Sequence, residues 1–180
     1  MRQDIRLAGF GGQGIILSGY LLGKAAGLYA GREAIFTQSY GPEARGGACA
    51  AQVSVSDEPI EYAYFDLADT LVVMSQDAWT KYGPTAKPGA LVVIDEGLVD
   101  PGPGHDNLRR APFTRIAEEL GNRIVANITM LGYLTVGNDL ITREAMEEAI
   151  RTEVRPRFID LNLEAFARGY ACARQPEVVS

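Results

Sequence analysis

Short apolar runs alternate along this chain with longer segments in which apolar residues recur every three or four positions. The short runs predict buried strands, and the longer segments predict helices with one apolar face. Strands are expected over residues 5–10, 33–39, 48–56, 69–75 and 90–96, with another near Ile124 that runs into a helix. Further helices are expected over 13–30, 76–83, 114–121, 142–154 and 161–174.

Residues that favour element ends support these boundaries. Gly31 and Gly121 suit helix C-termini, and Thr142 suits an N-cap. The first strand, helix and strand suggest a parallel pair formed by the first two strands. The whole pattern predicts a single three-layer α/β domain over residues 1–180, with a sheet that is mostly parallel or mixed.

Length and charge narrow the class of protein. A chain of 180 residues can bury one sizeable core. Its formal net charge of -6 argues against a nucleic-acid or anionic-membrane partner. No apolar run approaches the roughly 20 residues of a membrane helix, and the N-terminus has no signal-peptide core. A cytoplasmic protein is therefore expected.

The inventory of reactive side chains is small. Cys49 and Cys172 have no neighbouring ligands at metal-binding spacing, so both are expected to be reduced packing residues. An iron–sulfur cluster held by this chain alone is excluded, because such a cluster needs about four thiolates. His105 lies in a turn rich in proline and glycine. No catalytic residue and no metal ligand can be assigned, and the chain does not look like a complete enzyme.

A glycine-rich segment, "GFGGQG", separates the first strand from the first helix. It has the spacing G-x-G-x-x-G, which lets a backbone turn tightly and approach an anion at a helix start. The segment could form a structural turn, cradle a phosphate or carboxylate, or allow the close approach of a partner subunit. Its candidate site residues are Gly9, Gly11, Gly12, Gln13 and Gly14.

The remaining requirements of a nucleotide site are missing. A dinucleotide fingerprint needs an acidic residue at the end of the second strand, where this chain has the uncharged Thr37, Gln38 and Ser39. A P-loop needs a Lys followed by Ser or Thr, which "GFGGQGII" lacks. A stand-alone nucleotide-binding domain therefore remains only an alternative.

A second unusual segment, "QSYGPEARGG", follows the second strand. Both segments should lie at the same edge of the sheet, because each follows the carboxyl end of a strand. Arg45 could present its guanidinium to a carboxylate or phosphate, or pair internally with Glu43. The candidate site residues here are Ser39, Tyr40, Glu43, Arg45 and Gly46.

Together these two segments resemble the gamma subunit of 2-oxoacid:ferredoxin oxidoreductases. The resemblance continues through "DTLVVMSQDAWTKY", "KPGALVVIDEGLV", "NITMLGYLTVG" and "NLEAFARGY", and so covers nearly the whole chain. It implies a Rossmann-like α/β/α domain without a nucleotide coenzyme of its own. It also implies a subunit that is inactive alone.

The resemblance further implies an activity for the assembled complex. Complexes of this family decarboxylate a 2-oxoacid with thiamine diphosphate and Mg²⁺, pass electrons through iron–sulfur clusters to ferredoxin, and release an acyl-coenzyme A. The implied partners are alpha and beta subunits, with a delta subunit in some complexes. The motif "SYGPEARGG" resembles the 2-oxoglutarate branch most, with pyruvate, branched-chain 2-oxoacids and indolepyruvate as alternative substrates.

The resemblance leaves the role of the two segments open. They could dock the alpha subunit, or they could hold the phosphates of coenzyme A. An exposed docking surface also predicts some self-association of the isolated chain.

Overall fold

The computed structural model describes residues 1–40 and 47–175 and contains one six-stranded sheet. The strand order is β2-β3-β1-β4-β5-β6. The strands are β1 (Arg2–Phe10), β2 (Glu33–Tyr40), β3 (Ala48–Ser56), β4 (Ala68–Val73), β5 (Ala86–Asp95) and β6 (Leu108–Ala111).

The sheet is mixed. β1, β4, β5 and β6 form a parallel series, whereas β3 is antiparallel to both β1 and β2. The expected parallel pair of the first two strands is therefore wrong, since β3 lies between β1 and β2. Antiparallel strands can be joined by a short connection. β3 therefore pairs with β2 along one side and with β1 along the other. β2 still runs in the same direction as β1.

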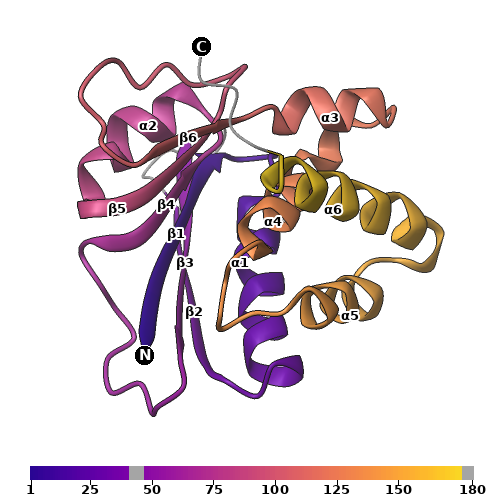
Figure 1. Cartoon of the computed structure of the whole chain (residues 1–180), viewed down its shortest axis with the longest axis horizontal. Helices are drawn as coiled ribbons and strands as arrows, with labels where there is room; N and C mark the ends of the chain where they lie inside the picture. The colour runs from indigo at the N-terminus through magenta and orange to yellow at the C-terminus, as the bar shows by residue number, and fades with distance from the viewer. Residues whose placement is uncertain (41–46, 176–180) are drawn as a thin grey trace.

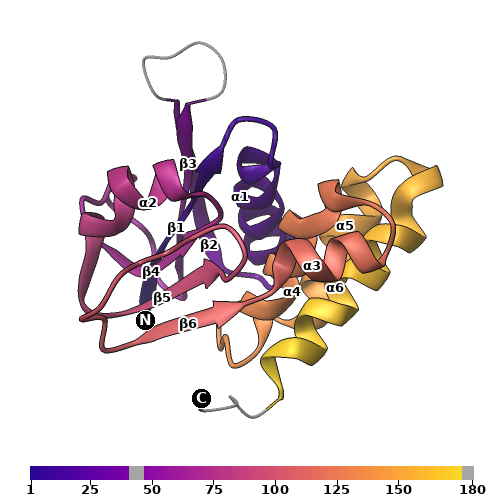
Figure 2. The same ribbon diagram turned by 90° about the horizontal axis from the view of Figure 1, so that it is seen from above.

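Helices cover the two faces of the sheet unequally (Figure 1). α2 lies against one face, and the larger helical group lies on the other, as the second view also shows (Figure 2). The α-helices are α1 (Ile15–Lys24), α2 (Gln76–Tyr82), α3 (Phe113–Glu119), α4 (Ala126–Thr135), α5 (Arg143–Glu153) and α6 (Ile159–Ala173). A π-helical turn, η1 (Ala25–Tyr29), extends α1, and short 3-10 turns are η2 (Gly83–Thr85), η3 (Arg123–Val125) and η4 (Pro156–Phe158).

The main core lies between the sheet and the larger helical group. α1 buries Leu21 and Leu22 against the central strands, where Leu7 and Val53 are fully buried. A smaller apolar cluster lies beneath α2 and includes Ala78. Burial of such side chains stabilises the fold by roughly 1.5–3 kcal/mol for each large aliphatic group.

α4 and α6 cross with their backbones in close contact. A Cβ atom at Gly132 would overlap the Phe166 carbonyl, and one at Gly169 would overlap the Thr129 carbonyl. Both glycines are thus required by the spacing of the two helices. This crossing fixes α4, whose first turn contacts the glycine segment described below.

Several predicted boundaries are confirmed. β3 occupies residues 48–56, and Thr142 caps α5 by accepting a hydrogen bond from the Ala145 N–H at 3.2 Å. The strand expected near Ile124 is wrong, because η3 and then α4 occupy this segment. The Asn122 side chain caps η3 by accepting from the Ile124 N–H at 3.1 Å.

The short strand β6 was not predicted. It contains only four residues, including two exposed arginines, so no apolar run marks it. In the part of the chain that the structure describes, no helix is both long and apolar enough to cross a bilayer.

Candidate functional site

The two candidate segments begin at one edge of the sheet, as predicted. Phe10 at the end of β1 pairs with Ala48, and Tyr40 at the end of β2 pairs with Cys49. The Gly11 N–H also donates to the Gly47 carbonyl at 3.3 Å. β3 therefore starts where the other two strands end and brings the two segments together.

Gly14 begins α1 in a left-handed conformation. Its φ of 73° is one that side-chain-bearing residues rarely adopt, and a Cβ atom there would overlap the Asn127 Nδ2. Asn127, which is buried in the first turn of α4, donates from Nδ2 to the Gly14 carbonyl at 3.1 Å. The start of α1 is thus held against α4.

The Gln13 side chain fixes the glycine turn from within. Its Oε1 accepts from the Phe10 N–H at 2.9 Å, and its Nε2 donates to the Met74 carbonyl at 2.7 Å. The Met74 N–H in turn donates to the Ala8 carbonyl at 2.8 Å. Both ends of the Gln13 amide are therefore engaged in joining the ends of β1 and β4, and the residue positions the turn.

The N-terminus of α1 presents backbone N–H donors, and within residues 1–40 and 47–175 no side chain caps it. Gly14 provides no side-chain cap, and the first turn contains no acidic residue. The first N–H groups of a helix and its dipole favour an anionic or acceptor group at this end. The neighbouring Gly12, with φ of 106°, has no atom closer than 3.9 Å to the position of a Cβ.

The segments that meet at this turn carry exposed apolar side chains: Phe10 ends β1, Leu17 lies in the first turn of α1, and Ile124 comes three residues before Asn127. We call Phe10, Gly12, Leu17 and Ile124 the glycine rim. The exposed fractions of its three apolar side chains are 42% for Phe10, 41% for Leu17 and 74% for Ile124. Exposed apolar side chains beside the start of a helix are typical of a surface that contacts another molecule.

The second candidate segment is only partly described. Ser39 is exposed on β2 opposite Ala50, and the backbone of Tyr40 pairs with Cys49. Glu43, Arg45 and Gly46 lie outside the described residues. Their roles, and the choice between an internal Glu43–Arg45 pair and a ligand contact, stay predictions.

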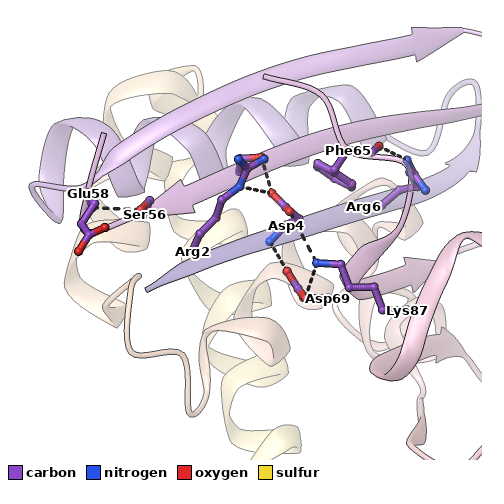
Figure 3. A network of polar contacts seen from close by, with 9 residues as sticks. Arg2, Asp4, Arg6, Ser56, Glu58, Phe65, Asp69 and Lys87 are labelled. Atoms are coloured by element: carbon purple, nitrogen blue, oxygen red, sulfur yellow. Dashed lines mark hydrogen bonds and ion pairs between the residues drawn. The ribbon is translucent and has the colours of Figure 1, made fainter. Parts of the chain in front are cut away.

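A polar network lies at the opposite end of the strands, where β1, β4 and β5 begin (Figure 3). The buried Asp4 accepts from Arg2 Nε at 2.9 Å and from Ser54 Oγ at 2.6 Å. Asp69 accepts from Lys87 Nζ at 2.7 Å and from the Asp4 N–H at 2.9 Å. These groups satisfy one another, so the network explains how the start of β1 is held.

Arg6 extends this network beneath the chain that follows β3. It donates to the Phe65 and Asp66 carbonyls at 3.1 and 3.0 Å (the Phe65 bond is drawn in Figure 3). Burial lowers the pKa of the Arg6 guanidinium below its ordinary value. Its hydrogen bonds tie the segment after β3 to the sheet.

The cysteines and the histidine do not assemble into a reactive centre. Cys49 is buried and Cys172 is half-buried, and burial raises the pKa of both thiols. His105 packs edge-on against Trp79, with ring centres 5.0 Å apart, and its Nε2 lies 3.0 Å from the Pro101 carbonyl. Within residues 1–40 and 47–175, no three Cys, His, Asp or Glu side chains are grouped as a metal site.

The fold and the site define a class of protein: an α/β domain whose glycine turn and apolar rim face outward, with no catalytic set assembled in the described residues. The Pyruvate ferredoxin/flavodoxin oxidoreductase family matches residues 4–172, and the chain belongs to this family. The predicted resemblance to gamma subunits of 2-oxoacid:ferredoxin oxidoreductases is thereby confirmed.

Individual relatives agree with this assignment. The chain is 50% identical to the 2-oxoglutarate synthase subunit KorC of Methanocaldococcus jannaschii, covering 97% of this chain and 96% of the relative. The crystal structure of a keto/oxoacid ferredoxin oxidoreductase gamma subunit from Geobacter sulfurreducens matches with a TM-score of 0.86 and 35% identity, covering 96% and 97% of the two chains.

A solved enzyme also contains a domain of this kind. The 2-oxoglutarate:ferredoxin oxidoreductase from Magnetococcus marinus, with 2-oxoglutarate, coenzyme A and succinyl-CoA bound, matches with a TM-score of 0.85 and 27% identity. The match covers 96% of this chain and 31% of that chain. In that protein, a domain like this one is therefore part of a longer polypeptide.

Asn127 and Met74 were not among the predicted site residues. Met74 contributes only its backbone carbonyl, which side-chain patterns cannot predict. Asn127 is a polar residue in an almost wholly buried helix, and this is the signal that could have identified it.

Proposed function

We propose that this chain is the gamma subunit of a 2-oxoglutarate:ferredoxin oxidoreductase. The assembled enzyme would convert 2-oxoglutarate and coenzyme A to succinyl-CoA and CO₂ while reducing ferredoxin. The observation that carries the proposal is the 50% identity to a 2-oxoglutarate synthase subunit over nearly the full length of both chains. Pyruvate, branched-chain 2-oxoacids and indolepyruvate are the competing substrates.

The groups that perform the redox chemistry do not fit this chain. An iron–sulfur cluster needs about four thiolates, and the whole sequence has two cysteines. Both thiols are at least partly buried, with raised pKa values that disfavour the ligating thiolate. Thiamine diphosphate, Mg²⁺ and the clusters are therefore assigned in this proposal to alpha, beta or delta partners.

The contribution of this chain would be a docking surface. The apolar side chains of the glycine rim suit a polypeptide partner, whereas a pyrophosphate would favour charged groups around it. Because Gln13 is engaged internally, the turn would meet the partner mainly through its backbone and through Phe10, Leu17 and Ile124. The partner would lie over the carboxyl ends of the parallel strands, where the glycine turn is.

Contact with coenzyme A is a second candidate role for the same edge. The uncapped start of α1, without an acid in its first turn, favours an anion. The related enzyme from Magnetococcus marinus has been solved with coenzyme A bound. The two roles predict different kinetic consequences and can be separated.

A pair of exposed apolar residues provides a matched test in the co-expressed complex. Ile124 and Tyr64 are 74% and 78% exposed, but only Ile124 belongs to the glycine rim. We expect Ile124→Asp to weaken subunit association at least ~10-fold, a loss of about 1.4 kcal/mol, and Tyr64→Asp to leave it unchanged. Equal effects of the two variants would contradict docking at the rim.

The coenzyme A role and the substrate need kinetic measurements. If coenzyme A contacts the turn, Gly12→Val raises KM for coenzyme A while the subunits stay associated; if the rim only docks a partner, this KM is unchanged in the assembled enzyme. The kcat/KM values for four 2-oxoacids identify the substrate. A higher value for pyruvate than for 2-oxoglutarate would contradict the proposed substrate.

A further inference from the structure

We propose that two copies of this chain pair through β2, antiparallel to each other, so that their sheets become continuous. This inference concerns a different surface from the glycine rim and does not depend on the identity of the 2-oxoacid. The self-association expected from the sequence would then take place at β2.

β2 is an edge strand, and its described residues lack the features that usually prevent pairing. It lies at the end of the sheet and pairs with β3 in an unbroken register from Glu33–Ser56 to Tyr40–Cys49. Its eight residues include no proline and no lysine, and its only charge is at Glu33. A long, regular and nearly uncharged edge strand is a ready template for another strand.

The other edge of the same sheet shows the contrast. β6 has only four residues, and Arg109 and Arg110 are exposed in its middle. A short, charged edge is a common protection against strand addition. Among the described residues, the sheet is thus protected at its β6 edge, and no strand pairs with the outer side of β2.

An apolar helix surface runs beside this edge. α1 lies along β2 (Figure 1), and η1, which extends it, also contacts this strand. The Tyr20 ring packs edge-on against Phe36, with ring centres 6.3 Å apart. On this helical segment Tyr20 and Leu28 are exposed, with exposed fractions of 41% and 70%. Two copies joined at β2 would each bring such a helix to the junction, adding apolar contact to the backbone pairing.

The one charged residue of β2, Glu33, favours antiparallel over parallel pairing of two copies. Antiparallel pairing about a two-fold axis near Phe36 and Thr37 places the two Glu33 side chains at opposite ends of the junction. The neighbouring charges are balanced, since Lys24 pairs with Glu153 at 3.0 Å and Arg32 precedes Glu33 in the chain. The repulsion expected from a net charge of -6 is therefore small at this surface.

Side chains on the same face of the sheet also match across such an axis. Ile35 and Thr37 lie on one face, so Ile35 would face Thr37 or Ser39 of the second copy, depending on the register. Such a contact joins a β-branched apolar side chain to small hydroxyl side chains without a buried charge. The surface is complementary to itself.

Sedimentation velocity of the purified full-length chain tests the proposal. We expect the wild-type mass to approach twice that of one chain as the concentration rises through the micromolar range. Ile35→Lys and Thr37→Lys should each raise the dimer dissociation constant at least ~10-fold, because each places a charge on the edge. Tyr64→Lys, which places the same charge on an exposed site away from β2, should leave it unchanged.

Controls keep folding and function separate from pairing. Each variant must melt within a few degrees of the wild type, and at least one of the two β2 variants should meet this condition because both sites are partly exposed. In the assembled complex, Thr37→Cys should form a cross-link between two copies of this chain with a short bismaleimide, whereas Tyr64→Cys should not.

A single-chain mass at every concentration, or equal dimerisation of the β2 and Tyr64 variants, would overturn the proposal. So would the absence of a Thr37→Cys cross-link in the complex. The rim variant Ile124→Asp distinguishes the two proposals: it should still form the β2 dimer while losing its partner subunit. Loss of partner binding alone would therefore leave this inference standing, and loss of the dimer alone would leave the proposed function standing.

Discussion

The contact between Gly14 and Asn127 can be measured by comparing two glycines with the same backbone conformation. Gly14 and Gly31 have φ values of 73° and 64°. A Cβ at Gly31 would have no atom within 4 Å, whereas one at Gly14 would overlap the Asn127 Nδ2. Gly31→Ala therefore reports the backbone cost alone, and Gly14→Ala reports that cost plus the lost contact.

The expected magnitudes differ clearly. The left-handed conformation costs an alanine about 1–2 kcal/mol, and the stiffer unfolded chain recovers about 0.4–1 kcal/mol, so Gly31→Ala should lower the free energy of unfolding by about 1 kcal/mol. Gly14→Ala also displaces a buried amide from its 3.1 Å hydrogen bond, which adds about 1–3 kcal/mol. Its total cost should be about 2–4 kcal/mol.

Urea unfolding followed by circular dichroism, with Asn127→Ala as a third variant, provides the assay. In the Asn127→Ala background the overlap is absent, so Gly14→Ala should cost only as much as Gly31→Ala. The coupling between the two sites should then be about 1–3 kcal/mol. If Gly14→Ala costs no more than Gly31→Ala, or if its cost is the same in both backgrounds, Asn127 does not hold the start of α1.

Further predictions concern the helix crossing, the turn and the thiols. Gly169→Ala should destabilise the chain by about 1–3 kcal/mol despite the better helix propensity of alanine, because the new Cβ overlaps a carbonyl of α4; an unchanged urea midpoint would refute the crossing. Gln13→Leu should lower the free energy of unfolding by about 1–3 kcal/mol, since it removes two hydrogen bonds, and a wild-type unfolding curve would contradict this role. Because burial raises the pKa of Cys49 and Cys172, both should react with iodoacetamide more slowly than free cysteine at pH 8, and their rates should still rise above the ordinary thiol pKa of about 8.5. Fast labelling of Cys49 at neutral pH would show that this site is open.

The sequence predicted the elements best where local chemistry alone decides them. Thr142 could be identified as a cap because its side chain bonds to the backbone three residues ahead. The alternation of small or apolar residues with polar ones identified β3 with its observed bounds, 48–56. The position of the glycine turn between β1 and α1 followed from its flanking patterns.

Contacts between distant segments could not be predicted in this way. The position of β3 between β1 and β2 depends on which strands it pairs with. Its own residue pattern is compatible with pairing to either of them. The close crossing of α4 and α6 depends on Gly132 and Gly169 facing each other, which only the packed structure decides. Ile124 has a β-branched side chain suited to a strand, but the capping of η3 by Asn122 overrides that local preference.

The candidate site shows the same division. The glycines and Gln13 could be predicted as a group from their spacing, yet their partners come from β4 and α4. Gln13 looked available for a ligand in the sequence, whereas the structure engages both ends of its amide. The roles of Glu43, Arg45 and Gly46 stay predictions.

Purification of the tagged chain from its native cells under gentle conditions tests whether this chain acts as a subunit of a 2-oxoglutarate:ferredoxin oxidoreductase. We expect a thiamine-diphosphate-binding beta chain and a larger alpha chain to be retained with it. We also expect the preparation to reduce ferredoxin only when 2-oxoglutarate and coenzyme A are both supplied. A solitary chain that holds a pyridine nucleotide tightly and supports no 2-oxoacid oxidation would show that it is not such a subunit.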